Sequence, residues 1–131
     1  MISIDTNIAV RAIIGDDPAQ TASARQLIEK GVWISLTVIL EIDWVLKSYY
    51  RLVAAERAEY ISGFLLNRKI TAEDKACLFW AIERMRDGAD FADMIHIVAS
   101  RGKDAFVSFE KRLDQFAGAD CPVPILRPEN V

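Results

Sequence analysis

The sequence predicts an α/β protein, a three-layer α/β/α sandwich with a central parallel sheet of about four or five strands. Short apolar segments alternate with longer segments of helical periodicity along the whole chain, and this alternation is typical of parallel sheets. A length of 131 residues fits one domain spanning residues 1–131. With 52% hydrophobic and 27% charged residues, the composition excludes a disordered chain, which would be poorer in apolar residues.

The first third of the chain predicts two strands and two helices. Asp17 followed by Pro18 is typical of a helix start, because the Asp side chain caps free N–H groups and proline suits the first helical position. A glycine follows each helix and ends it. The expected elements are the strand Met1–Ile4, a helix ended by Gly15, a helix closed by Gly31 and the strand Val32–Ser35.

The middle third is expected to be mostly helical. Thr37 is placed to cap a long apolar helix, VILEIDWVLKSYY. Three elements are expected after it: a helix over Ala54–Leu66, a minor strand at Lys69 and Ile70, and a helix from Thr71 to Asp87 that Gly88 closes.

The last third predicts one helix and two strands. Asp90 is placed to cap a helix that ends at Gly102, and the segment Ala105–Phe109 has the composition of a strand. The segment PVPIL, Pro122–Leu126, predicts a further strand. Because proline cannot donate to a sheet ladder, the two prolines favour a place at the sheet edge.

The charge balance limits how the protein binds a partner. The 16 Lys and Arg residues against 19 Asp and Glu leave a net charge of −3, so bulk electrostatics would not hold nucleic acid. Cys77 and Cys121 lack the spacing of a zinc site or a disulfide framework. The start at Met1 has no basic leader, and no apolar run reaches membrane-spanning length. We therefore expect a cytoplasmic protein that does not enter a membrane.

The apolar content also predicts an oligomer. The mean hydropathy of +0.14 is high for a small monomer. Because a chain of this size has difficulty covering so many apolar side chains, some are expected to lie against another chain. We expect a homodimer, with the helix around Trp44–Tyr50 as a candidate contact.

Four acidic residues are expected at one end of the sheet. Asp5 follows the first strand, and Glu41 lies near the start of the helix after the second. Asp93 lies in the first turn of the helix after Gly88, and Glu110 follows the strand AFVSF. Ligands of open α/β sheets bind outside the carboxyl ends of the strands, so these side chains are expected to converge. Clustered carboxylates without cysteine favour Mg²⁺ or Mn²⁺, and such an ion activates water for attack on a phosphodiester.

Most of these acids also have a purely structural interpretation. Asp and Glu favour helix N-termini, where they cap N–H groups and face the positive end of the helix dipole. Asp90, Asp93 and Glu41 are each explained in this way. For Asp90 the capping role is favoured, with Asp93 as the third helical residue, although its position also suits a residue that orients a metal ligand.

Further polar residues flank the acids. Asp5 is less easily explained as a cap, because Thr6 and Asn7 follow it with polar groups that orient its carboxylate or bind a water of the metal. Lys111 and Arg112 lie at the proposed active edge, where they are able to contact a phosphate backbone.

The single histidine is not favoured as a catalytic base. His96 lies three residues after Asp93, which makes a general base conceivable. It lies within the apolar run MIHIVA, however, so a hydrogen-bonded core or semi-buried histidine is the favoured interpretation.

Four segments of the chain resemble a known family. The opening IDTN, the acid inside TVILEIDWVL, the segment GADFADMIHIVAS and the strand end FVSFEKRL look like the signatures of a PIN-domain ribonuclease, in order and with its usual spacing. More narrowly, they resemble a VapC-type toxin of a bacterial toxin–antitoxin pair. The resemblance implies that Asp5, Glu41 and Asp93 are the three metal-binding acids. Where the family often has a fourth Asp, this chain has Glu110, which we expect to support catalysis.

The resemblance also implies a reaction and partners. It implies a PIN-like fold and an Mg²⁺- or Mn²⁺-dependent endoribonuclease that leaves 5′-phosphate and 3′-hydroxyl ends on its RNA substrate. It further implies a homodimer and a cognate antitoxin whose C-terminal segment blocks the acidic site.

Two other functions remain open at this stage. A haloacid-dehalogenase-type phosphatase also has an Asp at the end of its first strand, but it requires a second Asp two residues later, where this chain has Asn7. In a non-catalytic interaction module, the acids would only cap helices. Metal binding distinguishes the ribonuclease from such a module.

Overall fold

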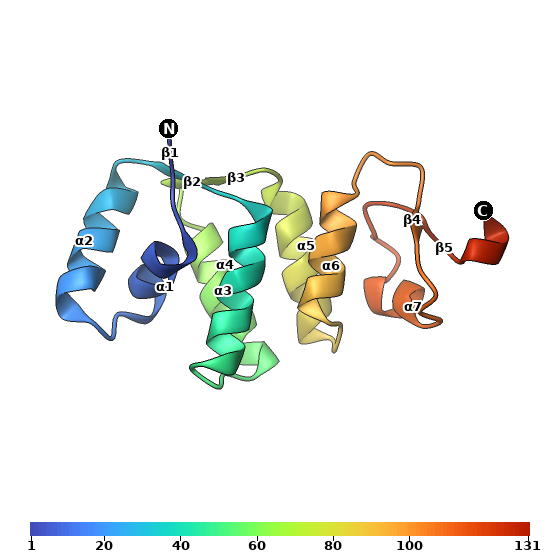
Figure 1. The fold of residues 1–131 in the computed structure, drawn as a ribbon, viewed down its shortest axis with the longest axis horizontal. Helices are drawn as coiled ribbons and strands as arrows, with labels where there is room; N and C mark the ends of the chain where they lie inside the picture. Colours follow the sequence, from blue (N-terminus) through green and yellow to red (C-terminus); the bar gives the residue numbers. More distant parts are fainter. The chain divides into compact units, whose positions relative to one another are not determined.

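The computed structural model describes all residues from 1 to 131 (Figure 1). The chain forms two compact units, which we call unit 1, Met1–Lys75, and unit 2, Ala76–Val131. Each unit contains strands, helices and buried apolar side chains of its own.

Unit 1 contains a three-stranded parallel sheet in the order β1-β2-β3. Its strands are β1 (Ile2–Ser3), β2 (Val32–Ile34) and β3 (Ile70–Ala72). The register pairs Val32 with Ile2 on one side and with Ile70 on the other. Val32 and Ile34 of the central strand are inaccessible to solvent, as is typical of β-branched residues in a strand covered on both faces.

Unit 1 also contains four helices, of which α1 is the central one. They are α1 (Thr6–Ile14), α2 (Pro18–Glu29), α3 (Leu36–Ser48) and α4 (Ala54–Leu65). Helix α1 contacts α2, α3 and α4, while α2 also contacts β2, and α4 contacts β3. Figure 1 shows these helices next to one another below the strands. The start of α1 therefore lies where both α2 and α3 can contribute to a site.

Capping side chains explain where the helices of unit 1 begin. The predicted helix start at Asp17 and Pro18 is confirmed, because Asp17 Oδ1 accepts a hydrogen bond of 3.1 Å from the first turn of α2. The prediction of Thr37 as a cap is wrong. Ser35, directly after β2, caps α3 through a hydrogen bond of 3.1 Å. Thr37 lies inside the first turn, where its hydroxyl is 2.9 Å from Ser35 Oγ.

Unit 2 contains three helices, a 3-10 helix and two strands. They are α5 (Lys75–Arg86), whose first residue belongs to unit 1, α6 (Phe91–Ala99), β4 (Phe106–Val107), α7 (Leu113–Ala117), β5 (Ile125–Leu126) and η1 (Pro128–Asn130). Strands β4 and β5 pair in parallel, with Phe106 opposite Ile125. Most of the buried apolar side chains of this unit come from α5 and α6.

The structure corrects two expectations about secondary structure. Thr71 does not begin a helix, because it lies in β3, and α5 begins only at Lys75. Ile70 and Thr71 are β-branched, and their pairing with β2 outweighs the local helical periodicity. Helix α7 was not expected, because its five residues are too few to show a clear helical period.

The predicted α/β fold class with parallel strands is confirmed. All strand pairs are parallel, and the strands alternate with helices along the chain, as in a three-layer α/β/α fold. The expectation of one central sheet with four or five strands is wrong, because β1, β2 and β3 form a three-stranded sheet in unit 1 while β4 pairs with β5 in a separate two-stranded sheet of unit 2. No helix combines the length and the apolar character that crossing a membrane requires.

Candidate functional site

Asp5 and Glu41 line the same hollow of unit 1. The hollow has a volume of about 310 Å³ and lies between the start of α1 and α3, where its lining reaches from Thr37 to Val45. Thr6, Asn7 and Thr37 contribute oxygen atoms to its lining. The structure thus brings together the acid that follows β1 and the acid that lies after β2.

Asp5 is the N-cap of α1. Its Oδ1 accepts a hydrogen bond of 3.0 Å from the Ile8 N–H. The capping role, which we expected less for Asp5 than for the other acids, is therefore present there. Asp5 is exposed, and the cap uses only one of its carboxylate oxygens, so its negative charge remains available at the hollow.

Glu41 reaches the hollow from the second turn of α3. The side chain is exposed, whereas neighbouring Ile42 is buried. Thr6 is buried beside Asp5, whereas Asn7 is exposed. The two acids and their polar neighbours therefore give this hollow a hydrophilic rim.

In unit 2, Asp90 and Asp93 form the start of α6. Asp90 is the predicted N-cap, since its Oδ1 accepts a hydrogen bond of 3.0 Å from the Asp93 N–H. Partial burial of the Asp93 carboxyl raises its pKa, the charge of Asp90 raises it further, His96 lowers it and Glu110 adds a smaller increase. Glu110 and Asp93 therefore lie within electrostatic reach of each other.

Glu110 lies in the turn between β4 and α7. Its Oε1 accepts a hydrogen bond of 3.3 Å from the Arg112 N–H, and its own N–H donates to Ser108 Oγ at 3.0 Å. Lys111 and Arg112 are exposed. The Arg112 guanidinium lies 5.2 Å from the centre of the Phe116 ring, a cation–π contact that leaves its hydrogen-bond donors free to meet a phosphate.

The side chains around Asp5, Glu41 and Asp93 have the chemistry that a hard divalent ion requires. No three His, Cys, Asp or Glu side chains, however, are gathered closely enough to form a metal site by themselves. The hollow of unit 1 offers carboxylate, hydroxyl and amide oxygens and no sulfur, which is the donor set of Mg²⁺ or Mn²⁺. Partial burial and then the charge of Asp90 raise the pKa of Asp93, and a cation would relieve the repulsion between the two carboxylates.

The environment of His96 differs from the one expected. His96 is exposed, so the prediction of a core or semi-buried histidine is wrong. The i, i+3 spacing places it on the same face of α6 as Asp93, whereas Met94 and Ile97 are fully buried. The apolar run MIHIVA thus contains one position that faces solvent.

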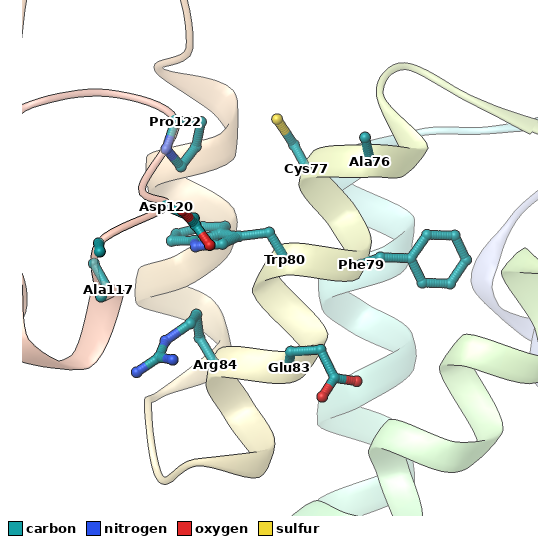
Figure 2. Close-up of a pocket in the computed structure, with 11 residues that line it drawn as sticks. Ala76, Cys77, Phe79, Trp80, Glu83, Arg84, Ala117, Asp120 and Pro122 are labelled. Atoms are coloured by element: carbon teal, nitrogen blue, oxygen red, sulfur yellow. The ribbon is translucent and has the colours of Figure 1, made fainter.

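A second hollow in unit 2 contains none of the four candidate acids. Its volume is about 540 Å³, and it lies between α5 and residues 117–122. Figure 2 shows Trp80 extending from α5 toward Asp120 and Pro122, while Phe79 points away. The indole Nε1 of Trp80 is buried without a hydrogen-bond partner. Sequence reasoning missed this hollow, because the helical spacing of Trp80 is also that of a packing residue.

Comparison with known proteins identifies the family. The PIN domain model matches residues 2–119, which is most of the chain. No curated protein matches the sequence. PIN domains are generally nucleases, so the match supports a nuclease role. Together with the parallel α/β fold, the match shows that this chain belongs to the PIN domain family.

Proposed function

We propose that the protein is a metal-dependent endoribonuclease and the cytoplasmic toxin of a toxin–antitoxin pair. The observation that carries the proposal is the PIN domain match over residues 2–119, and the shared hollow of Asp5 and Glu41 supports it. In this proposal the whole chain, 1–131, acts as a single domain.

The carboxylates of Asp5, Glu41 and Asp93 would hold Mg²⁺ or Mn²⁺. When bound, such an ion supplies a water of lowered pKa and positive charge against the phosphate. Glu110 plays a supporting role, because its longer side chain is able to reach the ion through a water.

The chain's other polar residues position these groups. Thr6 and Asn7 flank Asp5 in the same hollow and orient its carboxylate or a water. Asp90 fixes the first turn of α6 through its bond to the Asp93 N–H. Lys111 and Arg112 are exposed cations that contact the RNA backbone and offset the negative net charge of the protein.

The alternatives receive less support. The family match assigns the chain to PIN domains, and Asn7 replaces the second Asp that a haloacid-dehalogenase-type phosphatase requires. A non-catalytic module would explain Asp5 and Asp90 as caps. It would not explain why Glu41, which caps nothing, shares a hollow with Asp5.

The proposed partners follow from the toxin assignment. A cognate antitoxin would cover the acidic site with its C-terminal segment. A homodimer would cover part of the exposed apolar surface, which includes Trp44 and Tyr49 on and just after α3.

The test is cleavage of a single-stranded RNA with and without a chelator. We expect the protein to cut the RNA only when Mg²⁺ or Mn²⁺ is present and to leave 5′-phosphate and 3′-hydroxyl ends. Asp93→Asn should abolish cutting, whereas Asp104→Asn, an exposed control, should not. Cutting that persists in chelator, or in Asp93→Asn at the parental rate, would contradict the proposal.

A further inference from the structure

We propose that the groove between α1 and α2 binds the base of a nucleotide next to the cleaved bond and that Gln20 reads this base. The inference rests on the ribonuclease function proposed above and names a subsite for its substrate. The groove has a volume of about 530 Å³, within the range of small-molecule sites.

The groove is continuous with the candidate active site. Asp5 and Asn7 line both the groove and the hollow that contains Glu41. An RNA strand with a phosphate at Asp5 therefore has the groove as an adjoining space. The flanking nucleotide is the part of the substrate that can reach it.

The walls of the groove suit a flat apolar ligand with a polar edge. Ile8, Ala24 and Leu27 supply apolar lining and are buried or half-buried. Gln20 and Ser23 are exposed on α2 and border the groove with an amide and a hydroxyl. Nucleobases combine an apolar face with hydrogen-bonding edges, and proteins recognise unstacked RNA bases through both features.

The charges along the groove favour a base over a phosphate. Arg11 is the one cation that lines it, and its Nη1 is paired with Asp16 Oδ1 at 3.1 Å. Asp16 Oδ2 also accepts a hydrogen bond of 2.9 Å from the Tyr50 hydroxyl, which lowers the pKa of Asp16 and keeps it ionised. Since the charge of Arg11 is balanced, the groove beyond Asp5 suits an uncharged group.

The orientation of the Gln20 amide is fixed by Arg11. Arg11 Nε donates a hydrogen bond of 2.7 Å to Gln20 Oε1. Because a guanidinium only donates, the amide oxygen must face Arg11, and the NH₂ group is left for a ligand. Where the exocyclic group of the base faces Gln20, the amide NH₂ donates to a carbonyl, such as guanine O6 or uracil O4, and meets no acceptor in the amino group of adenine or cytosine. Gln20 therefore selects a base with a carbonyl at that edge.

The decisive variant is Gln20→Glu, because it keeps the acceptor for Arg11 and replaces the NH₂ donor by an acceptor. The full-length chain would cut a pool of random single-stranded RNA in Mn²⁺, and the ends would be sequenced. In the parent, we expect guanine or uracil to be enriched at one position beside the cut. Gln20→Glu should shift the ratio of carbonyl to amino bases there by about 3- to 10-fold, the range of one hydrogen bond. Gln20→Leu should flatten the preference, and Gln26→Leu, an exposed residue of α2 outside the groove, should leave it unchanged.

A second readout separates this inference from the nuclease function. In the folded parent, free guanosine or uridine at millimolar concentration should shift the Gln20 side-chain amide resonance in a nuclear magnetic resonance spectrum. If the parent cuts no RNA but shows this shift, the groove does bind a base, and it is the nuclease proposal that fails. If the parent cuts RNA and Gln20→Glu keeps the parental base preference, the groove is not a base subsite. A third outcome is that Gln20→Glu keeps the parental base preference but no longer copurifies with a protein that the parent binds. In that case the groove binds a protein segment, and the inference is overturned.

Discussion

Asp5 has two roles that depend on different properties of one carboxylate. Capping α1 requires an acceptor oxygen for the Ile8 N–H, 3.0 Å away, whereas holding a divalent ion requires the negative charge. Asparagine caps helices as well as aspartate does but carries no charge. Substitutions at this position can therefore separate the structural role from the proposed catalytic one.

We expect Asp5→Asn to keep the stability of the parent and Asp5→Ala to lose about 1 kcal/mol, the usual cost of removing a cap. Both variants should lack RNA cleavage. Urea denaturation gives the free energies of unfolding, and the cleavage assay gives the activities. The separation of roles fails if Asp5→Asn is as unstable as Asp5→Ala, or if Asp5→Ala still cuts RNA.

The raised pKa of Asp93 predicts that the stability of the protein depends on pH when divalent ions are absent. Partial burial and the negative charges of Asp90 and Glu110 raise its pKa above the ordinary value of 3.8. The folded state thus binds the proton more tightly than the unfolded chain, and the contribution of Asp93 to stability falls as the pH rises through the window above 3.8. Asp93→Asn removes this loss.

We therefore expect Asp93→Asn, in chelator near neutral pH, to melt at most a few degrees above the parent. The difference should vanish below about pH 3.8, where the carboxyl is protonated in both states. Thermal melting across this pH range, with Asp104→Asn as an exposed control, measures the effect. Identical pH profiles for Asp93→Asn and the parent would show that Asp93 is not destabilised by its surroundings.

For single residues, the sequence allowed a correct prediction where the position of a side chain depends only on the path of the backbone. Asp5 and Glu41 were expected to meet because both follow strands of one parallel sheet, and they line one hollow. The contact between Arg11 and Gln20 could not be foreseen, because it depends on side-chain conformations across a turn. The exposure of His96 was misjudged, since an apolar run outweighed its helical position.

At the scale of elements, a buried ion pair connects α3 to α4. Arg57 Nε lies 2.7 Å from Asp43 Oδ1, and each side chain is 10% exposed. Arg57 Nη1 also donates to the Leu52 carbonyl at 2.8 Å. Because Glu41 lies on α3, this pair helps to fix the helix that carries a candidate ligand. The only signal in the sequence was an Asp within the apolar run VILEIDWV.

We expect Asp43→Asn to lower the free energy of unfolding by about 3 to 5 kcal/mol, because it leaves the buried guanidinium without its carboxylate. Glu83→Gln, which removes the exposed partner of Arg86, should cost less than about 1 kcal/mol. The double variant Asp43→Leu/Arg57→Met should recover much of the loss, since an apolar pair needs no counter-charge. Equal losses for Asp43→Asn and Glu83→Gln in urea denaturation would contradict this account.

Helices with strong start signals were predicted well, and four of the five strands lie within the predicted strand segments, whereas β3 was predicted only in part. The Asp17 and Pro18 signal placed α2 correctly, because capping is a local interaction. Strand β3 was mistaken in part for a helix start at Thr71, since its conformation depends on pairing with β2, which is distant in sequence. The division of the strands into two sheets likewise depends on tertiary pairing.

At the scale of the whole molecule, the exposed aromatic residues near the end of α3 predict self-association. Trp44 is 63% exposed and Tyr49 is 75% exposed. Because large exposed aromatic side chains are favourable anchors of interfaces, we expect light scattering to give twice the 14.7 kDa of one chain. Trp44→Ser should shift the equilibrium toward monomer, whereas Leu66→Ser, at an exposed residue directly after α4, should not. A monomer mass over a wide concentration range would rule out the homodimer.

The central claim is that carboxylates of this PIN domain hold a divalent ion that cuts RNA. A titration of the RNA cleavage rate with Mn²⁺ tests it most directly, using the parent, Asp5→Asn and Glu110→Gln. We predict that Asp5→Asn stays inactive at every Mn²⁺ concentration. Glu110→Gln should need about 10- to 100-fold more metal, as losses of supporting residues typically do, and then regain part of the parental rate. Cleavage by Asp5→Asn at the parental rate and Mn²⁺ dependence would contradict the claim.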